Sequence, residues 1–511
     1  MRTQNTVKNM MFSFVNIVLI TLLNIAYRTV FIQELNLEYL GINAALTNIL
    51  TLLSLAELGV AQAISFYLYK PLSHKDEGEV ALWINLFKKI YMYVGLVILF
   101  VGFFLSFFID KLIPVTLVSI GELRTLLILF LVSSSITYFL GYKRTLIIAD
   151  QKNYEIVLPI SISQFFEIVL KICILIYTKS MIATILVQII IRLLENLYVN
   201  RYIEKKYKEV FSATQKPLSP EKLQSFKVKM KSLVFHKVGD VFVNGTDNII
   251  ISALVGVSIL GIFSNYSMLI AMSTTIVLVI FNSITSSLGN LIAEKSEKSE
   301  GVFNSIQMIS FWIFGLISFL FFFLVQDFIV LWIGEAYLLD NTSVLLLAIN
   351  FFLLGVRVPL NVVKTAAGLF EKDRYAPLCQ GALNLMLSIY LCNLFGVNGV
   401  LLGTLISICL VPLWTQPYVV YRALFDTSLS SYFSRLTLFS LWLVGASVFI
   451  YYFFFYTLDY FNINNLYGLF LLKFIFVFIF FNSFMLTFYF RKKEFNFVRK
   501  KAYELSGKYN G

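Results

Sequence analysis

Long apolar runs separated by short polar segments dominate the chain. Each run is about 20 residues or longer and lacks the polar face that a helix of a water-soluble protein keeps toward solvent. About 20 apolar residues in a helix match the thickness of a bilayer's hydrocarbon core. Fourteen runs fall at residues 10–32, 40–69, 90–109, 125–142, 156–177, 180–200, 233–254, 258–290, 304–325, 343–363, 376–395, 398–421, 436–458 and 466–490. The pattern predicts an all-α polytopic membrane protein of about 14 transmembrane helices.

Composition supports this prediction and narrows the chemistry. The 511 residues are 59% hydrophobic and 14% charged, and the mean hydropathy is +0.81. The four cysteines lie in apolar runs without a Cys-x-x-Cys spacing, and the chain has two histidines. This pattern argues against a disulfide framework, a zinc site and haem, so we expect no cofactor or metal.

The positive charges indicate the topology of the chain. The net charge is +12, but the basic residues sit in short loops, so we expect no nucleic-acid partner. If the N-terminus is cytoplasmic, three of the 41 basic residues lie in outer loops, six lie within spans, and the rest lie inside. The opposite orientation would invert this bias, so the positive-inside rule predicts cytoplasmic N- and C-termini.

The chain is expected to form two six-helix lobes around a central cavity. A basic segment at 201–232 contains two prolines and divides the spans after the sixth. An offset of 220 residues aligns the first span with the seventh and Gly41 with Gly261, as expected for parallel repeats. We predict lobes at 1–215 and 216–430, and two additional helices with a cytoplasmic tail at 431–511.

Polar side chains within the spans are the candidate binding residues. On the scale from membrane-insertion experiments, a charge at the bilayer centre costs about 2.5–3.5 kcal/mol. Such a charge therefore needs a partner, a cavity or water. Positions 237, 240, 244, 247 and 248 follow the spacing of one helical face. We expect the headgroup of a substrate to contact residues from the first, seventh and tenth spans: Asn24, Arg28, Lys237, Asp240, Asn244, Asp247, Asn248 and Arg357.

Other charges within spans have structural explanations. Glu167 and Lys171 are four residues apart and are expected to neutralise each other. Arg192 and Glu195, three apart, are expected to do the same. Glu57 has three open interpretations: hydrogen bonding to backbone, pairing with a basic side chain, or ion coupling, the last shared with Asp240 and Asp247.

Two segments resemble the polysaccharide transporter family, the Wzx-type flippases of the multidrug/oligosaccharidyl-lipid/polysaccharide superfamily. They are residues 39–72 (YLGINAALTNILTLLSLAELGVAQAISFYLYKPL) and 235–252 (FHKVGDVFVNGTDNIIIS). The resemblance extends to the layout of six, six and two spans. It implies translocation of an undecaprenyl-pyrophosphate-linked oligosaccharide repeat unit to the outer leaflet of a bacterial cell membrane, for capsule or exopolysaccharide assembly. It also implies that Arg28 and Arg357 engage the pyrophosphate.

Two other functions remain open. One is a cation-coupled multidrug exporter of the same superfamily. The other is a membrane glycan polymerase or ligase, but the predicted outer loops are too short to present catalytic groups, so we expect no enzymatic activity. Expected partners of a flippase are membrane lipids and the polysaccharide polymerase and other assembly proteins.

Overall fold

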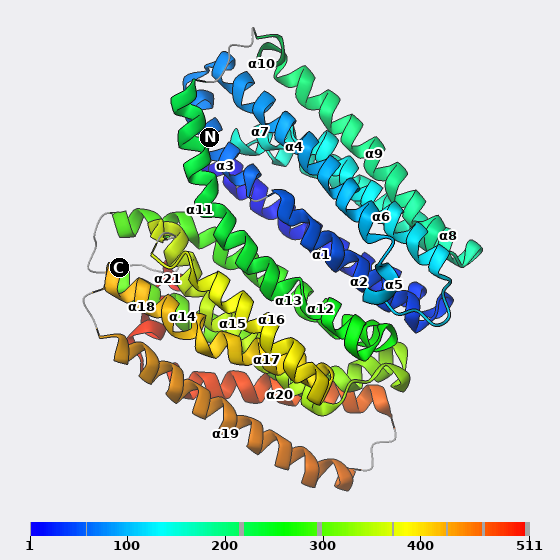
Figure 1. The fold of residues 1–511 in the computed structure, drawn as a ribbon. Coiled ribbons are helices and arrows are strands. Elements are labelled where there is room, and N and C mark those ends of the chain that lie inside the picture. The colour runs from blue at the N-terminus through cyan, green and yellow to red at the C-terminus, as the bar shows by residue number, and fades with distance from the viewer. Residues whose placement is uncertain are drawn as a thin grey trace. The chain divides into compact units, whose positions relative to one another are not determined.

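The computed structural model confirms an all-α membrane protein (Figure 1). It describes residues 2–57, 59–213, 219–293, 299–369, 372–425, 428–461 and 465–505. Within this part of the chain, 12 helices are long and apolar enough to cross a membrane. They match 12 of the 14 predicted spans, and the other two, at 40–69 and 233–254, are interrupted helices.

Contacts divide the chain into two compact units, Met1–Asn265 with Pro377–Gly396, and Tyr266–Ala376 with Val397–Gly511. The predicted lobe boundaries near 215 and 430 stay predictions. Unit 1 contains α1 (Arg2–Glu34), α2 (Leu37–Leu53), the 3₁₀ turn η1 (Ser54–Glu57), α3 (Val60–His74), α4 (Glu77–Leu105), α5 (Ile109–Leu112), α6 (Ile120–Gly141), α7 (Arg144–Ala149), α8 (Tyr154–Thr178), α9 (Met181–Lys206), α10 (Lys208–Ser212), α11 (Pro220–Asn244), α12 (Asp247–Ile250), the π-helical turn η2 (Ile251–Val255), the first residues of α13 (Val257–Ala293) and nearly all of α16 (Ala376–Phe395).

The first part of unit 1 is a bundle in which α8 packs against α1 and α9, and α6 packs against α4 and α9 (Figure 1). Many outward side chains of these helices are large and apolar, as lipid-facing positions require. Lipid tails are as apolar as the side chains, so van der Waals packing and internal hydrogen bonds hold the helices together. Small side chains allow close approach: Gly102 of α4 lies against Leu131 of α6.

The second predicted span is broken near its middle. Helix α2 ends at Leu53, a 3₁₀ turn follows, and α3 starts at Val60. Gly59 has a φ of 75°, in the left-handed region that favours glycine because it has no Cβ. The break places Glu57 at an interruption of the regular backbone hydrogen bonding.

The seventh predicted span is also interrupted. Helix α11 ends at Asn244, and α12 begins at Asp247 after two residues that are not helical. The Thr246 hydroxyl donates to the carbonyl of Phe242 over 2.7 Å and so caps the end of α11. The prediction that positions 237–248 share one face of a continuous helix is therefore wrong, because the helix breaks between 244 and 247.

Two helix starts related by the 220-residue offset pack against each other within unit 1. Helix α2 begins at Leu37 and α13 at Val257. A Cβ on Gly41 would lie 1.8 Å from the carbonyl oxygen of Val257, and one on Gly261 would lie 2.6 Å from that of Leu37. Each glycine thus contacts the start of the other helix, as two-fold related elements do. This reciprocal contact supports the predicted repeat.

Unit 2 contains the rest of α13, α14 (Ser299–Ile333), the 3₁₀ turn η3 (Glu335–Tyr337), α15 (Asn341–Ala367), α17 (Val397–Leu410), α18 (Pro412–Leu424), α19 (Leu429–Phe461), α20 (Leu466–Tyr489) and α21 (Lys493–Leu505). Helix α14 packs against α15, α20 and α21. The core is rich in phenylalanine, with Phe311 stacked on Phe439 at 4.9 Å between ring centroids. The two C-terminal spans therefore pack on the core of this unit.

Candidate functional site

A polar pocket of about 360 Å³ lies within the bundle of unit 1. Its lining comes from α1, α6, α7, α8 and α9: Ile20, Asn24, Thr137, Arg144, Gln164, Glu167, Ile168, Lys171, Arg192, Glu195 and Asn196. Most of these positions fall in the middle of membrane-spanning helices, where charges are costly unless they meet partners or water. The polar pocket is the main candidate site of this unit.

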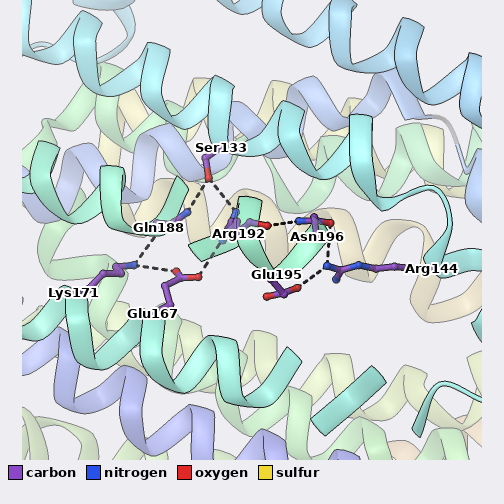
Figure 2. Close-up of polar contacts among 8 residues, drawn as sticks. All are labelled: Ser133, Arg144, Glu167, Lys171, Gln188, Arg192, Glu195 and Asn196. Atoms are coloured by element: carbon purple, nitrogen blue, oxygen red, sulfur yellow. Dashed lines mark hydrogen bonds and ion pairs between the residues drawn. The ribbon is translucent and has the colours of Figure 1, made fainter. Parts of the chain in front are cut away.

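One wall of the polar pocket is an ion pair along α8. Lys171 Nζ lies 3.7 Å from Glu167 Oε1, which confirms the predicted pair. Lys171 also donates to Gln188 Oε1 over 3.1 Å, and its ammonium lies 4.5 Å from the centre of the Tyr27 ring. Figure 2 shows Lys171 and Glu167 directed toward each other from the same helix. The lysine is thus held by an acid, an amide and an aromatic ring.

The second acid of the polar pocket has a different partner from the predicted one. Glu195 Oε1 accepts a 2.6 Å hydrogen bond from Arg144 Nη2, which also donates to Asn196 Oδ1 over 3.0 Å (Figure 2). Arg192 lies 3.9 Å from Glu167 and donates to Ser133 Oγ over 3.4 Å. The prediction of an Arg192–Glu195 pair is therefore wrong, because the turn after α6 brings Arg144 to Glu195.

The polar pocket carries a positive excess. Arg144, Lys171 and Arg192 line it with Glu167 and Glu195, which leaves a formal charge of +1. The side chain of Arg192 is 40% exposed, more than those of Lys171 (14%) and Arg144 (23%), and both its contacts are long. The Arg192 guanidinium is therefore the cation of this group that is best placed to donate hydrogen bonds to an anion.

Among the predicted substrate contacts whose side chains the structure describes, Asn24 is the one that lines the polar pocket. Its carboxamide nitrogen donates to the carbonyl of Ile20 over 2.8 Å, which leaves the carboxamide oxygen to accept a further hydrogen bond. Helix α1 packs along α8, and this packing brings Asn24 to the same hollow as Glu167.

Arg28 lies one turn further along α1 but outside the lining of the polar pocket. Its side chain is buried; Nε donates to Asn265 Oδ1 over 2.8 Å and Nη2 donates to Ser264 Oγ. The start of α13 thus holds the guanidinium in this conformation. A role of Arg28 in phosphate binding stays a prediction.

Of the remaining predicted residues, three have side chains that the structure does not describe, and the other three do not line the polar pocket. The side chains of Lys237, Asp240 and Asn244 lie outside the described residues, although the backbone of α11 is described. Asp247 and Asn248 are half-buried at the start of α12. In unit 2, Arg357 Nε donates to Gln416 Oε1 over 3.3 Å. Their roles as substrate contacts stay predictions.

Glu57, the predicted ion-coupling residue, accepts hydrogen bonds from two tyrosines. Tyr91 Oη donates to Oε1 over 2.6 Å, and Tyr138 Oη lies 3.4 Å from Oε2. None of the ion pairs among the described residues includes Glu57. Of its three interpretations, pairing with a basic side chain does not occur in the described part of the chain, and ion coupling stays a prediction.

Sequence reasoning missed that the charges of α8 and α9 surround a cavity. It explained each charge by a neighbour on the same helix, which removes the need for a cavity. An available signal was the excess of cations over acids in 144–195, which holds five Lys or Arg residues and four Asp or Glu residues. The contacts between Arg144 and Glu195 join residues 51 positions apart, which helical spacing alone does not reveal.

Comparison of the sequence with protein-family models and with curated proteins finds no match. Among solved structures, the chain resembles the lipid II flippase MurJ in an inward closed conformation, with a TM-score of 0.70 and 14% identity, over 94% of this chain and 98% of that one. It also resembles an inward-facing MATE-family transporter of the MOP superfamily, with a TM-score of 0.64 and 14% identity, over 78% and 94% of the two chains. A Vibrio cholerae MATE transporter matches at 15% identity, over 84% and 98%, with a TM-score of 0.59. At these identities the likeness establishes the fold alone, which this chain shares with the flippase and the MATE transporters.

Proposed function

We propose that this chain, built on the fold of the lipid II flippase and the MATE transporters, translocates an undecaprenyl-pyrophosphate-linked oligosaccharide repeat unit. The direction is from the cytoplasmic to the outer leaflet of a bacterial cell membrane, for capsule or exopolysaccharide assembly. The polar pocket among membrane-spanning helices is the observation that carries this proposal. No covalent chemistry is needed for this task.

The physical requirement of the substrate supports a polar pocket. Phosphates and sugars cannot cross hydrocarbon unaided, whereas a polyprenyl tail is soluble in it. Charges that served only to hold helices together would pack without leaving a hollow of 360 Å³. A hollow lined by five charged side chains is instead suited to a polar group that enters and leaves.

Residues of the polar pocket have complementary roles in this proposal. Arg192 and Lys171 would attract the pyrophosphate, and Glu167, Glu195 and Asn24 would accept hydrogen bonds from sugar hydroxyls. We retain the other predicted contacts as proposed ligands: Arg28, Lys237, Asp240, Asn244, Asp247, Asn248 and Arg357.

An apolar hollow in unit 2 is suited to the tail of the substrate. It measures about 700 Å³ and lies between α14, α15 and α19. Phe319, Phe322, Leu345 and Leu443 are among its lining residues. Its chemistry fits part of a polyprenyl chain, which gains van der Waals contacts there.

The membrane potential is the proposed driving force. A pyrophosphate diester of about two negative charges that leaves a cytoplasm negative by about 100 mV gains roughly 4–5 kcal/mol. Coupling to protons or sodium through Glu57, Asp240 or Asp247 is the alternative. In this proposal both termini lie in the cytoplasm. The polymerase and other assembly proteins would receive the product on the outer side.

Reconstituted vesicles test the proposal. The probe is a fluorescent undecaprenyl-pyrophosphate-linked disaccharide, and a membrane-impermeant quencher reports the leaflet in which it resides. The chain alone should accelerate flipping, and collapse of an imposed potential should slow it. Arg192→Gln should lower the rate about 10- to 100-fold, because it removes charge-assisted hydrogen bonds of about 1.5–3 kcal/mol.

The matched control is Lys89→Gln, which removes an exposed cation distant from the polar pocket in sequence. A flipping rate indistinguishable from protein-free vesicles would overturn the proposed function. Equal rates for Arg192→Gln and the unsubstituted chain would instead overturn the role of the polar pocket.

A cation-coupled drug exporter is the second candidate, and the two carboxylates of the polar pocket favour it. Glu167 and Glu195 lie beside an accessible hollow and would attract a cationic drug after local rearrangement of their ion pairs. Efflux of a lipophilic cation that depends on Glu167, in vesicles that do not flip the lipid-linked disaccharide, would establish this candidate.

A further inference from the structure

A small polar hollow at one end of unit 2 has no role in the proposed transport. Helices α14, α19, α20 and α21 and the turn before α21 surround it. Its lining residues are Asn304, Gln307, Met308, Phe311, Arg435, Phe488, Tyr489, Lys492 and Glu494. We call it the basal hollow. Arg435 follows the first residues of α19 and Lys492 follows the end of α20, so both lie at the membrane face that the sequence predicts to be cytoplasmic.

The two cations of the basal hollow are held by aromatic groups. Arg435 Nη2 donates to the Tyr421 hydroxyl over 2.7 Å. Lys492 Nζ lies 4.3 Å from the centre of the Phe488 ring. Neither cation takes part in the ion pairs found among the described residues. With Glu494, the lining carries a formal charge of +1.

Three buried polar atoms around the basal hollow lack hydrogen-bond partners in the described part of the chain: Asn304 Oδ1, Gln307 Nε2 and Arg435 Nε. Gln307 is only 3% exposed. A buried donor without a partner costs about 1–3 kcal/mol, so a group that satisfies these atoms is expected. The carboxamide of Asn304 becomes a donor after a half-turn, because its oxygen and nitrogen have nearly the same shape.

The size of the basal hollow limits what enters it. Its volume of about 20 Å³ admits one or two groups of the size of a water molecule. The two anionic oxygens of a phosphodiester have this size, and the rest of a headgroup would stay at the membrane surface. Next to the hollow, Arg491, Lys493 and Arg499 are exposed on and before α21. Such cations attract anionic lipids to the cytoplasmic leaflet.

We propose that the basal hollow binds the phosphate of an anionic phospholipid of the cytoplasmic leaflet. Arg435 and Gln307 donate to one phosphate oxygen, and Lys492 neutralises the phosphate from the side of α21. The bound lipid then joins α14, α19 and α21 at the membrane surface.

Native mass spectrometry of the purified full chain tests this proposal by counting bound lipid. The chain is titrated separately with dioleoyl-phosphatidylglycerol, dioleoyl-phosphatidylcholine and inorganic phosphate. We expect retention of one phosphatidylglycerol and little phosphatidylcholine. Lys492→Gln and Arg435→Gln should each lower this retention about fivefold, the effect of one cation near a membrane surface. Among the described residues, the Lys492 ammonium lies over the rings of Phe488 and Tyr489 and takes part in no ion pair, so Lys492→Gln keeps the test valid if Arg435→Gln does not fold.

Lys89→Gln and Lys205→Gln are the matched controls, because both remove an exposed cation that does not line the basal hollow. Equal retention of phosphatidylglycerol by the unsubstituted chain and Lys492→Gln would overturn the proposal. An equal loss in all four variants would also overturn it, because a general surface attraction would then explain binding. Retention of inorganic phosphate without lipid would overturn the lipid as the source of the phosphate.

Discussion

The guanidinium of Arg28 is bonded to Asn265, with 2.8 Å between Nε and Oδ1. The contact joins the C-terminal part of α1 to the first turns of α13, and both residues are buried. A cation expected to meet a phosphate is therefore part of an internal contact in this conformation. The predicted role of Arg28 in phosphate binding would require this contact to open.

Loss of this contact should destabilise the protein. Arg28→Gln removes the donors to Asn265 and Ser264 and leaves buried acceptors unsatisfied, which costs about 1–3 kcal/mol. We expect a lower melting temperature of the purified chain, measured by intrinsic fluorescence. In a double-mutant cycle with Asn265→Ala, the two losses should be less than additive. Additive losses would contradict a direct contact.

The reciprocal glycines should not tolerate a side chain. Gly41→Ala and Gly261→Ala each place a methyl group within 3 Å of a backbone carbonyl oxygen, which forces the two helices apart. We expect a loss of about 1–3 kcal/mol of stability for each. The control is Gly445→Ala, where nothing lies within 4 Å of the added group. It should be neutral or stabilising by about 0.5–1 kcal/mol, because alanine favours a helix. Equal melting temperatures for all three variants would show that the close approach is absent.

The ion pair of α8 should show rescue by a second substitution. Glu167→Gln leaves Lys171 charged among buried groups, and the cost of breaking a buried pair is about 3 kcal/mol or more. Glu167→Gln with Lys171→Met removes both charges and should recover most of the stability. Urea or detergent unfolding measures the difference. A double variant as unstable as Glu167→Gln alone would indicate that Glu167 acts mainly through Arg192.

A pH dependence is expected from Asp340, which caps α15 in a loop outside the spans. Burial alone would raise its pKa, but hydrogen bonds from Ser343 and Asn398 outweigh burial and lower the pKa. A carboxyl with a lowered pKa in the folded state stabilises the protein above its unfolded pKa of about 4. This contribution is lost as the pH falls through the folded pKa.

Asp340→Asn should therefore flatten the acidic side of the stability profile, measured as melting temperature from about pH 6 to pH 3. Asp340→Ala should also remove the cap and cost about 1 kcal/mol at neutral pH. Glu335→Gln, in the same loop, serves as the control. An unchanged acidic profile in Asp340→Asn would contradict the role of this carboxyl.

Hydropathy was sufficient to predict where the chain is helical, because the bilayer requires continuous apolar segments. It did not predict the break in the second span, because Glu57, Leu58 and Gly59 are too few to lower the average hydropathy of the run. The left-handed backbone of Gly59 depends on tertiary packing. A single glycine also occurs within regular helices, so its presence alone does not predict a break.

The candidate site was predicted less completely than the fold. The sequence singled out Asn24 because a polar residue within an apolar span is itself a signal, and Asn24 lines the polar pocket. Arg144 lies just after the predicted span at 125–142, yet it bonds Glu195 of α9. Such partners depend on how helices pack, and a pattern along one helix does not contain that information.

Gly41 and Gly261, which meet at the starts of α2 and α13, restrict how the sequences of the two halves of the chain can change. Each glycine is fitted to the main chain of the opposite half, so a larger residue in one half disturbs the other. A change at this point requires compensation 220 positions away. The meeting point should therefore be among the slowest to vary, even where the surrounding lipid-facing positions have lost all similarity between the halves.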